Sequence, residues 1–364
     1  MKILCVIDSL VSGGAQRQMV QLAIGFKDRG YEVRFLTYHK LNFFKPELDY
    51  WSIHLHTIVE PNYIKRLFKM RKAIRKENPD VVLAFLQSPS FIATFAGFPY
   101  RRWRLVVGER SADPKAPYSF ISRFFKFFHF FPDYIVGNSN KSLEILRKTN
   151  PLLNKSKQKV IYNIVSISEQ LSHVENNKNK YLEVVVAARY VKLKNLDGLI
   201  EAISLLPDIY KNRIRVNWYG MISIDNVNYI QSVQDKINKY ELSEKIILND
   251  TTSDIFKKYL QADFVAMLSY HESFPNSICE AMLLKKPVIV SRVSDIGSLI
   301  KEDLNGFVCE PDDPNSIKHA LIKAIDSTSF KNKKMGENNY NLAVKMFSKD
   351  KIIDSYLKLF KGER

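Results

Sequence analysis

Two carboxylates, Glu272 and Glu280, are separated by seven residues and have the spacing and type to hold a polar ligand. Pro275 lies between them, and a helix interior tolerates proline poorly. We therefore expect Glu272 on a loop and Glu280 in the first turn of a helix. The apolar run from Pro287 to Val290 predicts a buried strand beside them. A loop and a helix N-terminus next to a sheet form a polar pocket that favours an anionic ligand.

The same residues also fit a purely structural interpretation. Ser277 and Glu280 have the S-x-x-E spacing of a capping box, in which Glu280 only caps a helix. Glu272 would then be an ordinary solvated acid. The spacing of the two carboxylates does not by itself decide between these interpretations.

Two cations follow another predicted strand, Leu182 to Ala188. Arg189 and Lys194 bracket the loop that leads into the next helix. A loop with two cations at the end of a strand suits a diphosphate, which arginine can bind through two hydrogen bonds. Two solvated surface charges are the alternative. Gly220 ends a third strand, Val216 to Tyr219, in the same half of the chain.

The chain opens with a strand, Lys2 to Ile7, and a helix, Ala15 to Arg29. Gly13 and Gly14 lie at the start of that helix, where glycine lets backbone N–H groups approach a phosphate closely. The pattern is not G-x-G-x-x-G, so a nicotinamide-binding fingerprint is absent. A tight turn without a ligand remains the alternative for this pair.

A charged loop, Gly108 to Lys115, directly follows the predicted strand Arg104 to Val107. The ends of strands in open α/β sheets are where ligands bind. Glu109, Arg110 and Asp113 are therefore candidates for binding a second substrate, with a solvated loop as the alternative.

The sequence around these residues resembles the family 4 retaining glycosyltransferases. The carboxylate segment is E-S-F-P-N-S-I-C-E-A-M-L-L-K-K-P-V-I-V-S, followed by N-G-F from Asn305 and P-D-D from Pro311. The cations lie in A-R-x-x-x-x-K-N, the donor-phosphate motif of the family. S-G-G-A-Q resembles the family's G-G-A-E, with Gln16 in place of glutamate. E-R-S-A-D-P resembles the E-R-x-x-P loop of members that build lipid-linked glycans.

The resemblance implies the GT-B fold, an α/β architecture of two doubly wound, Rossmann-like parallel-sheet domains facing a cleft. Alternating strand and helix patterns along the chain are typical of such domains. We expect an N-terminal acceptor domain at residues 1–170 and a C-terminal nucleotide-sugar domain at residues 171–347. The polar segment His173 to Lys180 is the predicted linker. Residues 348–364 are expected to cross back to the first domain.

The resemblance also implies roles for the site. Glu280 binds the ribose hydroxyls, Glu272 holds the sugar near its 3- and 4-hydroxyls, and Arg189 and Lys194 stabilise the leaving diphosphate. Gly13 and Gly14 assist from across the cleft. The remaining donor-binding candidates are Gly220, Phe274, Pro275, Asn276, Ser277 and Ile278. No metal and no cofactor is expected, since no Asp-x-Asp pair lies at a suitable position and the family works without a metal.

Charge is distributed unevenly along the chain. Of the net charge of +17, +14 belongs to residues 1–170 and +3 to the rest. A basic first half suits an anionic lipid, a phosphorylated acceptor or nucleic acid. No nucleic-acid-binding motif is evident, so nucleic acid is not the expected partner. Three cysteines without a C-x-x-C pair indicate free thiols in a reducing compartment.

Two apolar stretches bear on membrane contact. The uncharged stretch Val81 to Tyr100 has the length of a membrane span, but Pro89 and Pro99 interrupt it, and we expect a buried strand and a short helix. Phe120 to Phe131 has polar residues, Arg123, Lys126 and His129, at every third position. We expect this stripe to be core, with insertion into a membrane leaflet as the alternative. The predicted helix Tyr63 to Glu77 is strongly basic and also suits an anionic surface.

The sequence therefore predicts a retaining, metal-independent glycosyltransferase that uses a UDP-sugar or another nucleotide-diphosphate sugar. The expected acceptor is a glycan or lipid-linked saccharide, in surface polysaccharide synthesis. No signal peptide is evident, so the expected location is the cytoplasm, peripherally on the inner face of the cell membrane. The alternatives are a sugar-nucleotide epimerase or phosphorylase with the same fold, a glycoside hydrolase, and a basic nucleic-acid-binding protein.

Overall fold

A computed structural model describes residues 1–167 and 181–363. The chain forms two compact units. Unit 1 comprises Met1–Ile164 and Phe347–Arg364, and unit 2 comprises Val165–Met346. The predicted linker His173 to Lys180 lies outside the described residues.

Unit 1 contains a seven-stranded sheet in the order β3-β2-β1-β4-β5-β6-β7, and every paired strand is parallel to its neighbour. The order reverses beside β1, which makes the sheet doubly wound, as predicted. The strands are β1 (Lys2–Val6), β2 (Glu32–Thr37), β3 (His54–Thr57), β4 (Val81–Phe85), β5 (Arg104–Glu109), β6 (Tyr134–Gly137) and β7 (Gln158–Val160).

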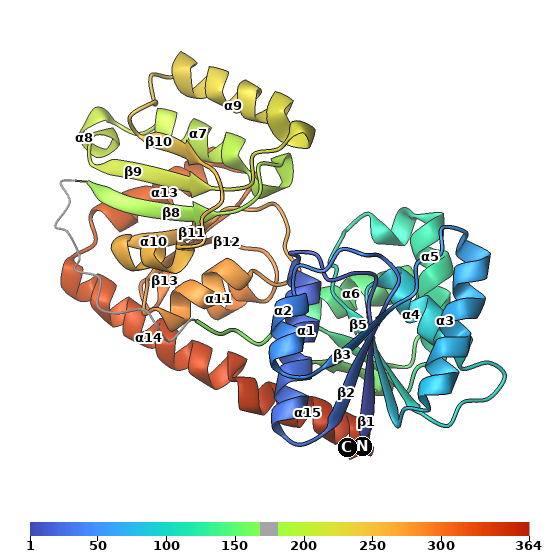
Figure 1. Cartoon of the computed structure of the whole chain (residues 1–364). Coiled ribbons are helices and arrows are strands. Elements are labelled where there is room, and N and C mark those ends of the chain that lie inside the picture. Colours follow the sequence, from blue (N-terminus) through green and yellow to red (C-terminus); the bar gives the residue numbers. More distant parts are fainter. Residues whose placement is uncertain (168–180, 364) are drawn as a thin grey trace. The chain divides into compact units, whose positions relative to one another are not determined.

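Helices cover both faces of this sheet (Figure 1). Alternate residues of each strand point to opposite faces, so Ile3 and Cys5 pack with α1 and α15, whereas Leu4 and Val6 pack with α3, α4 and α6. The helices are α1 (Gly14–Asp28), α2 (Lys45–Tyr50), α3 (Tyr63–Glu77), α4 (Gln87–Ala96), α5 (Phe120–Phe127), α6 (Asn140–Thr149) and α15 (Lys349–Lys361), with short 3-10 turns η1 (Ala116–Tyr118), η2 (Phe128–Phe130) and η3 (Lys155–Lys157).

The last helix of the chain, α15, completes the core of unit 1. The Phe360 ring packs 5.2 Å from that of Phe26 on α1, and Arg104 at the start of β5 donates to the carbonyls of Leu359 and Phe360. Arg29 on α1 forms ion pairs with Asp350 and Asp354.

Unit 2 contains a six-stranded parallel sheet in the order β10-β9-β8-β11-β12-β13, which is again doubly wound. Its strands are β8 (Leu182–Ala187), β9 (Ile214–Tyr219), β10 (Ile246–Asn249), β11 (Phe264–Met267), β12 (Val288–Ser291) and β13 (Gly306–Cys309). The helices are α7 (Leu196–Ser204), α8 (Asp208–Lys211), α9 (Val227–Lys239), α10 (Ile255–Gln261), α11 (Asn276–Leu283), α12 (Ile296–Leu299), α13 (Pro314–Ile325) and α14 (Ser329–Phe347), with 3-10 turns η4 (Lys192–Lys194) and η5 (Ile224–Asn226).

The uncharged stretch after Asp80 is not a membrane span. It forms the buried strand β4 and the ten-residue helix α4, as predicted. Among the described residues, no helix combines the length and the apolar character needed to cross a bilayer.

The prediction that Phe120 to Phe131 is core is wrong. Phe120, Phe124 and Phe127 are exposed, whereas Lys126 and His129 are buried. The reason is the buried carboxylate of Glu109 at the end of β5, which forms an ion pair with Lys126. A buried charge must be paired, so α5 turns Lys126 inward, which leaves Phe120, Phe124 and Phe127 on the outer side of the helix.

Candidate active site

The first part of the site is the loop between β8 and α7 in unit 2. Arg189 is exposed just beyond β8, and within the described part of the chain its side chain forms no hydrogen bond or ion pair. Lys194 ends the 3-10 turn η4, and Asn195 follows with a left-handed φ of 62°. The guanidinium is therefore available to a ligand, and the turn directs Lys194 independently of α7.

Lys194 and Glu272 form the polar centre of the site. The Lys194 Nζ lies 2.5 Å from Glu272 Oε1, and the two side chains are 16% and 15% exposed to solvent. The Ser269 hydroxyl donates to the same carboxylate oxygen at 2.8 Å. Two loops far apart in sequence, those after β8 and β11, thus hold one another in place and present a cation and a carboxylate together.

Glu280 lies on α11, one turn further from the loop than predicted. The helix begins at Asn276 with Pro275 as its N-cap, so Glu280 is its fifth residue and starts the second turn. The capping-box alternative fails for the same reason, because Ser277 lies inside the helix and cannot be its N-cap. Glu280 is buried at 8% exposure. The predicted donor-binding segment Phe274 to Ile278 includes Pro275 and the first turn of α11, the end of the helix that favours an anionic ligand.

Gly220 is required by the close approach of two strand ends. A Cβ at this position would lie 2.3 Å from the Ala188 carbonyl oxygen and 3.2 Å from the Tyr190 ring. The Trp218 indole N–H donates to the same carbonyl at 2.8 Å, and the Tyr190 hydroxyl donates to the Trp218 carbonyl. These contacts fix the backbone just before Arg189.

Asn195 is a site residue to which the sequence argument assigned no role. Its side-chain oxygen accepts from the Gly198 N–H and caps α7. Its amide donates to the carbonyls of Leu268 and Pro311, which follow β11 and β13. The signal was present in the sequence as an asparagine that follows Lys194 directly before an amphipathic segment, a position typical of N-caps.

In unit 1, Gly13 and Gly14 begin α1 as predicted. Gln16 is buried, and its amide donates to the Asp8 carboxylate at 3.1 Å. The Gln16 side chain also lies over Gly13, where a Cβ would meet its oxygen at 2.4 Å. Glutamine at this position therefore suits Asp8, because a glutamate would place two carboxylates in contact.

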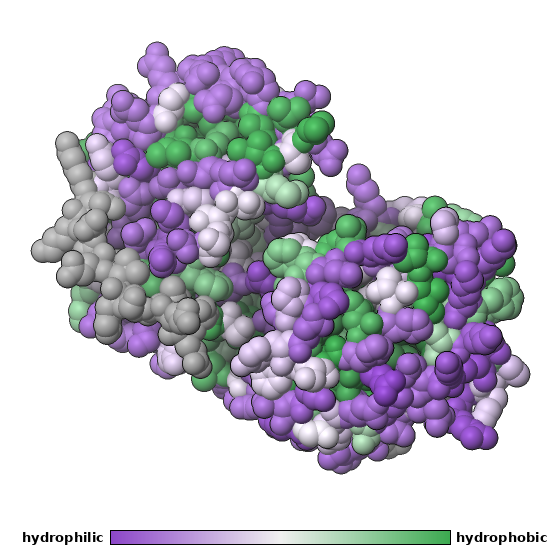
Figure 2. Space-filling model, viewed as in Figure 1, coloured by the Kyte–Doolittle hydropathy of each residue, from purple (hydrophilic) through white to green (hydrophobic). Residues whose placement is uncertain are grey.

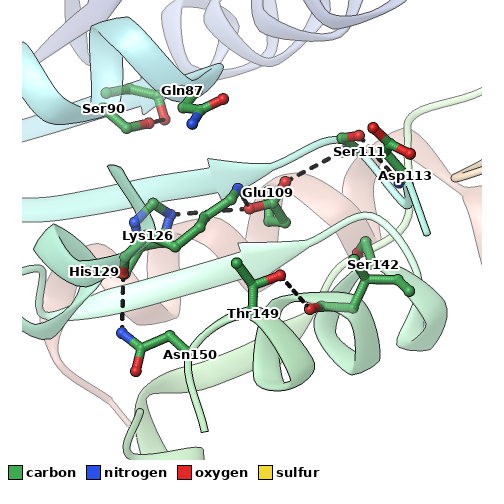
Figure 3. Close-up of polar contacts among 12 residues, drawn as sticks. Gln87, Ser90, Glu109, Ser111, Asp113, Lys126, His129, Ser142, Thr149 and Asn150 are labelled. Atoms are coloured by element: carbon green, nitrogen blue, oxygen red, sulfur yellow. Dashed lines mark hydrogen bonds and ion pairs between the residues drawn. The ribbon is translucent and has the colours of Figure 1, made fainter. Parts of the chain in front are cut away.

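The loop after β5 carries the other candidates of unit 1. Figure 3 shows Glu109 between Lys126 and the backbone of Ser111, whose N–H donates to it at 3.3 Å. Asp113 is exposed and accepts from the Lys115 N–H at 2.9 Å, which orders the start of η1.

Arg110 has partners within unit 1. Its guanidinium lies 3.8 Å from the centre of the Phe85 ring and donates to Asn163 and to the Tyr356 hydroxyl, at 3.0 and 2.5 Å. Through the Tyr356 hydroxyl, Arg110 connects the loop after β5 to α15.

The structure therefore places the candidates in two groups, each at the carboxyl ends of parallel strands. Unit 2 brings together Arg189, Lys194, Gly220, Glu272 and the segment from Phe274 to Glu280 after β8, β9 and β11. Unit 1 holds Gly13 and Gly14 after β1 and the charged loop after β5. Ligands bind at such strand ends in open α/β sheets.

Other features of unit 2 lie elsewhere. A cavity of about 550 Å³ lined by Leu182, Asp263 and Pro287 opens at the amino ends of β8, β11 and β12, away from Lys194. In the ranges 1–167 and 181–363, no group of three or more His, Cys, Asp or Glu side chains could hold a metal ion. Cys5, Cys279 and Cys309 are free and buried, and burial raises the pKa of each thiol.

Comparison with family models matches both units. Residues 12–169 match the model described as Glycosyltransferase Family 4, and residues 168–342 match Glycosyl transferases group 1. Together the two models cover all but the ends of the chain.

Two curated relatives share about a quarter of their residues with this chain. One, from Methanocaldococcus jannaschii, is described as an uncharacterized glycosyltransferase and is 25% identical over 64% of this chain and 62% of its own length. The other is 25% identical over 98% of both chains. It is the Campylobacter jejuni N-acetylgalactosamine-N,N'-diacetylbacillosaminyl-diphospho-undecaprenol 4-alpha-N-acetylgalactosaminyltransferase.

Solved structures share the architecture over the full length. The crystal structure of HepE from Anabaena in complex with UDP aligns with a TM-score of 0.85, 21% identity and 100% coverage of both chains. A glycosyltransferase from Rickettsia africae aligns with a TM-score of 0.82 and 19% identity, covering 100% of this chain and 98% of the other. At these identities the likeness shows the fold.

Proposed function

This chain belongs to the family 4 glycosyltransferases and has their GT-B fold, and we propose that it moves a sugar from a UDP-sugar to a lipid-linked saccharide. The observation that carries this proposal is the Lys194–Glu272 ion pair beside the first turn of α11, at the carboxyl ends of the unit 2 strands. A cation for a diphosphate and carboxylates for sugar hydroxyls are there combined in one unit.

The donor and acceptor classes are supported by the relatives. HepE was crystallised with UDP and with UDP-glucose, which favours a uridine nucleotide here. The Campylobacter relative is named for a diphospho-undecaprenol acceptor, which favours a lipid-linked saccharide and a role in surface-glycan synthesis.

The proposed reaction breaks the bond between the sugar C1 and the diphosphate oxygen. Negative charge develops on the leaving phosphate, and the Arg189 guanidinium, the Lys194 ammonium and the N–H groups at the start of α11 stabilise it. These cations and dipoles supply the positive charge that the diphosphate needs, so we propose a reaction without a metal ion or cofactor.

The carboxylates hold the donor in this proposal. Glu280 accepts hydrogen bonds from the ribose hydroxyls, and Glu272 accepts them from the sugar. Because Glu272 also pairs with Lys194, a change at either residue disturbs both the sugar and the phosphate contacts.

Retention follows from attack on the face that the diphosphate leaves. The acceptor oxygen forms its bond to C1 as the C1–phosphate bond breaks, and the acceptor proton passes to the departing phosphate oxygen. No enzyme nucleophile enters this scheme. The proposed location is the cytoplasmic face of a membrane, where a lipid-linked acceptor and a nucleotide-sugar meet.

A thermal-shift series tests this function. We expect UDP to bind only the native state and therefore to raise the melting temperature without added metal, whereas GDP and ADP should leave it unchanged. Lys194→Ala is expected to lose the UDP shift and at least about 100-fold in turnover. Lys192→Ala, an exposed lysine on the same turn, is the matched control. Normal turnover of Lys194→Ala, or equal shifts from all three nucleotides, would contradict the assignment.

A further inference from the structure

The outer face of α5 is a stripe of large apolar side chains exposed to solvent. Phe120, Phe124 and Phe127 are spaced by one helical turn and are 83%, 50% and 55% exposed. Ile121 beside them is 66% exposed. Contiguous exposed apolar residues of this size mark an interaction surface.

The orientation of this stripe is imposed from inside. Figure 3 shows Lys126 and His129 directed toward Glu109, with which Lys126 forms a buried ion pair. The Asn150 amide donates to the Lys126 carbonyl at 3.1 Å and anchors the same turn to the end of α6. Rotating α5 to bury its phenylalanines would expose or unpair these groups, so the apolar face stays outward.

The stripe continues into a wider aromatic surface on unit 1. Phe91 on α4 contacts the rings of Phe124 and Phe128 at 6.1 and 4.6 Å. One turn further along α4, Phe95 contacts Phe68 on α3 at 5.6 Å, and Phe68 is itself exposed. Three helices thus contribute to one aromatic surface, which we call the α3–α5 surface.

The charges around this surface are almost all positive. Helix α3 carries seven Lys and Arg residues and a single acidic residue, Glu77. Lys65 and Lys72 on α3, Arg123 on α5 and Lys115 just before η1 are all exposed. In Figure 2 hydrophobic and hydrophilic residues border one another over α3 and α5.

We propose that the α3–α5 surface docks on an anionic lipid bilayer, with the α5 phenylalanines inserted at the level of the headgroups. The combination of an apolar stripe and a surrounding excess of lysine and arginine matches an interface that is apolar below and negatively charged above. The absence of acidic residues on α4 and α5 removes the repulsion that a negatively charged surface would otherwise meet.

Helix α5 of the α3–α5 surface is connected directly to the charged loop after β5. Lys126 of α5 and the Ser111 N–H both bind Glu109, the last residue of β5, directly before that loop. Lipid binding on the outer side of α5 therefore acts on the loop whose residues Glu109, Arg110 and Asp113 are the candidates for acceptor binding. This inference rests on the proposed function, because only a lipid-linked acceptor requires the loop to be held at a membrane.

Flotation of the full chain with vesicles tests the docking surface. The native chain is expected to bind vesicles of phosphatidylcholine with phosphatidylglycerol, and to bind less at high salt. The variant Phe120→Ser/Phe124→Ser/Phe127→Ser is expected to lose about tenfold or more in binding. Phe330→Ser, which removes an exposed phenylalanine from unit 2, is the matched control and should bind as the native chain does.

The outcomes separate this inference from the proposed function. The triple variant should retain its UDP thermal shift and its activity on a water-soluble acceptor, while transfer to a lipid-linked acceptor in vesicles falls. Equal vesicle binding by the native chain and the triple variant would overturn the docking surface and leave the transferase assignment intact. A second outcome would also overturn it: the native chain self-associates and does not bind vesicles, and the triple substitution abolishes the self-association.

Discussion

At the residue scale, the polar side chains of this protein act in pairs. Lys194 and Glu272 hold each other in unit 2, and Gln16 donates to Asp8 in unit 1. The glutamine at position 16 is a departure from the glutamate usual in the family, and its neutral amide donates a hydrogen bond to Asp8, where a glutamate would place a second carboxylate against it. The choice of residue at position 16 is therefore explained by its hydrogen-bond partner Asp8.

His129 gives a pH-dependent prediction. Burial and the neighbouring Lys126 lower the pKa of His129 to about 3. In the unfolded chain the histidine has its ordinary pKa of about 6.5, so it binds a proton more readily than in the folded chain. The part of the free energy of unfolding that depends on neutral His129 is therefore fully present above about pH 6.5 and is lost as the pH falls toward 3. At pH 5 the loss is about 2 kcal/mol.

Urea denaturation at pH 7 and pH 5 checks this prediction. The variant His129→Gln cannot take up the proton and should lose about 2 kcal/mol less than the native chain over this interval. His54→Gln, which replaces an exposed histidine of the same unit, should behave as the native chain does. The same pH dependence in His129→Gln and the native chain would be inconsistent with a buried neutral imidazole.

At the element scale, loops after different strands are joined by single side chains. Asn195 caps α7 and binds the carbonyls after β11 and β13, so three segments meet at one amide. It is fully buried. Its removal affects the position of the adjacent Lys194 as well as the helix.

Asn195→Gly is expected to destabilise unit 2 by about 2–3 kcal/mol. Glycine keeps the left-handed φ at no cost, so the effect reports the lost hydrogen bonds and the buried carbonyls left without a donor. Chemical denaturation followed by tryptophan fluorescence measures it, because Trp218 reports on unit 2 and Trp51 and Trp103 report on unit 1. Asn62→Gly, which removes the exposed N-cap of α3, is the comparison and should cost only a few tenths of a kcal/mol. Equal effects of the two substitutions would exclude a linking role for Asn195.

At the scale of the whole molecule, unit 1 is built from both ends of the chain, and unit 2 is built from the residues between them. The last helix, α15, lies in the core of unit 1, after the whole of unit 2 has been formed by the intervening residues. The ends of the chain therefore depend on one another for stability.

Phe360→Ala tests this arrangement by calorimetry. The Phe360 side chain is 4% exposed and packs on Phe26, so its truncation should cost unit 1 about 3–5 kcal/mol. The transition of unit 2, identified by its rise with UDP, should not move. Phe307→Ala, in the core of unit 2, should show the reverse pattern. A fall of both transitions in either variant would argue that the units do not unfold independently.

The amino-acid sequence by itself determined the local elements, the doubly wound architecture and the loops that carry polar residues. Apolar runs such as Val81 to Phe85 are buried strands, and the bounds of α3 agree with its predicted range. These features follow from periodicity and from glycine and proline positions, which act over a few residues.

Only the tertiary structure decided which side chains meet. It paired Lys194 with Glu272, assigned Asn195 three backbone partners, and buried Lys126 while exposing Phe120, Phe124 and Phe127. The apolar pattern of Phe120 to Phe131 predicted the opposite orientation, because a pattern weighs hydrophobic area alone. A buried carboxylate 17 residues away, Glu109, outweighs that area, since leaving a charge without a partner costs more than exposing several rings.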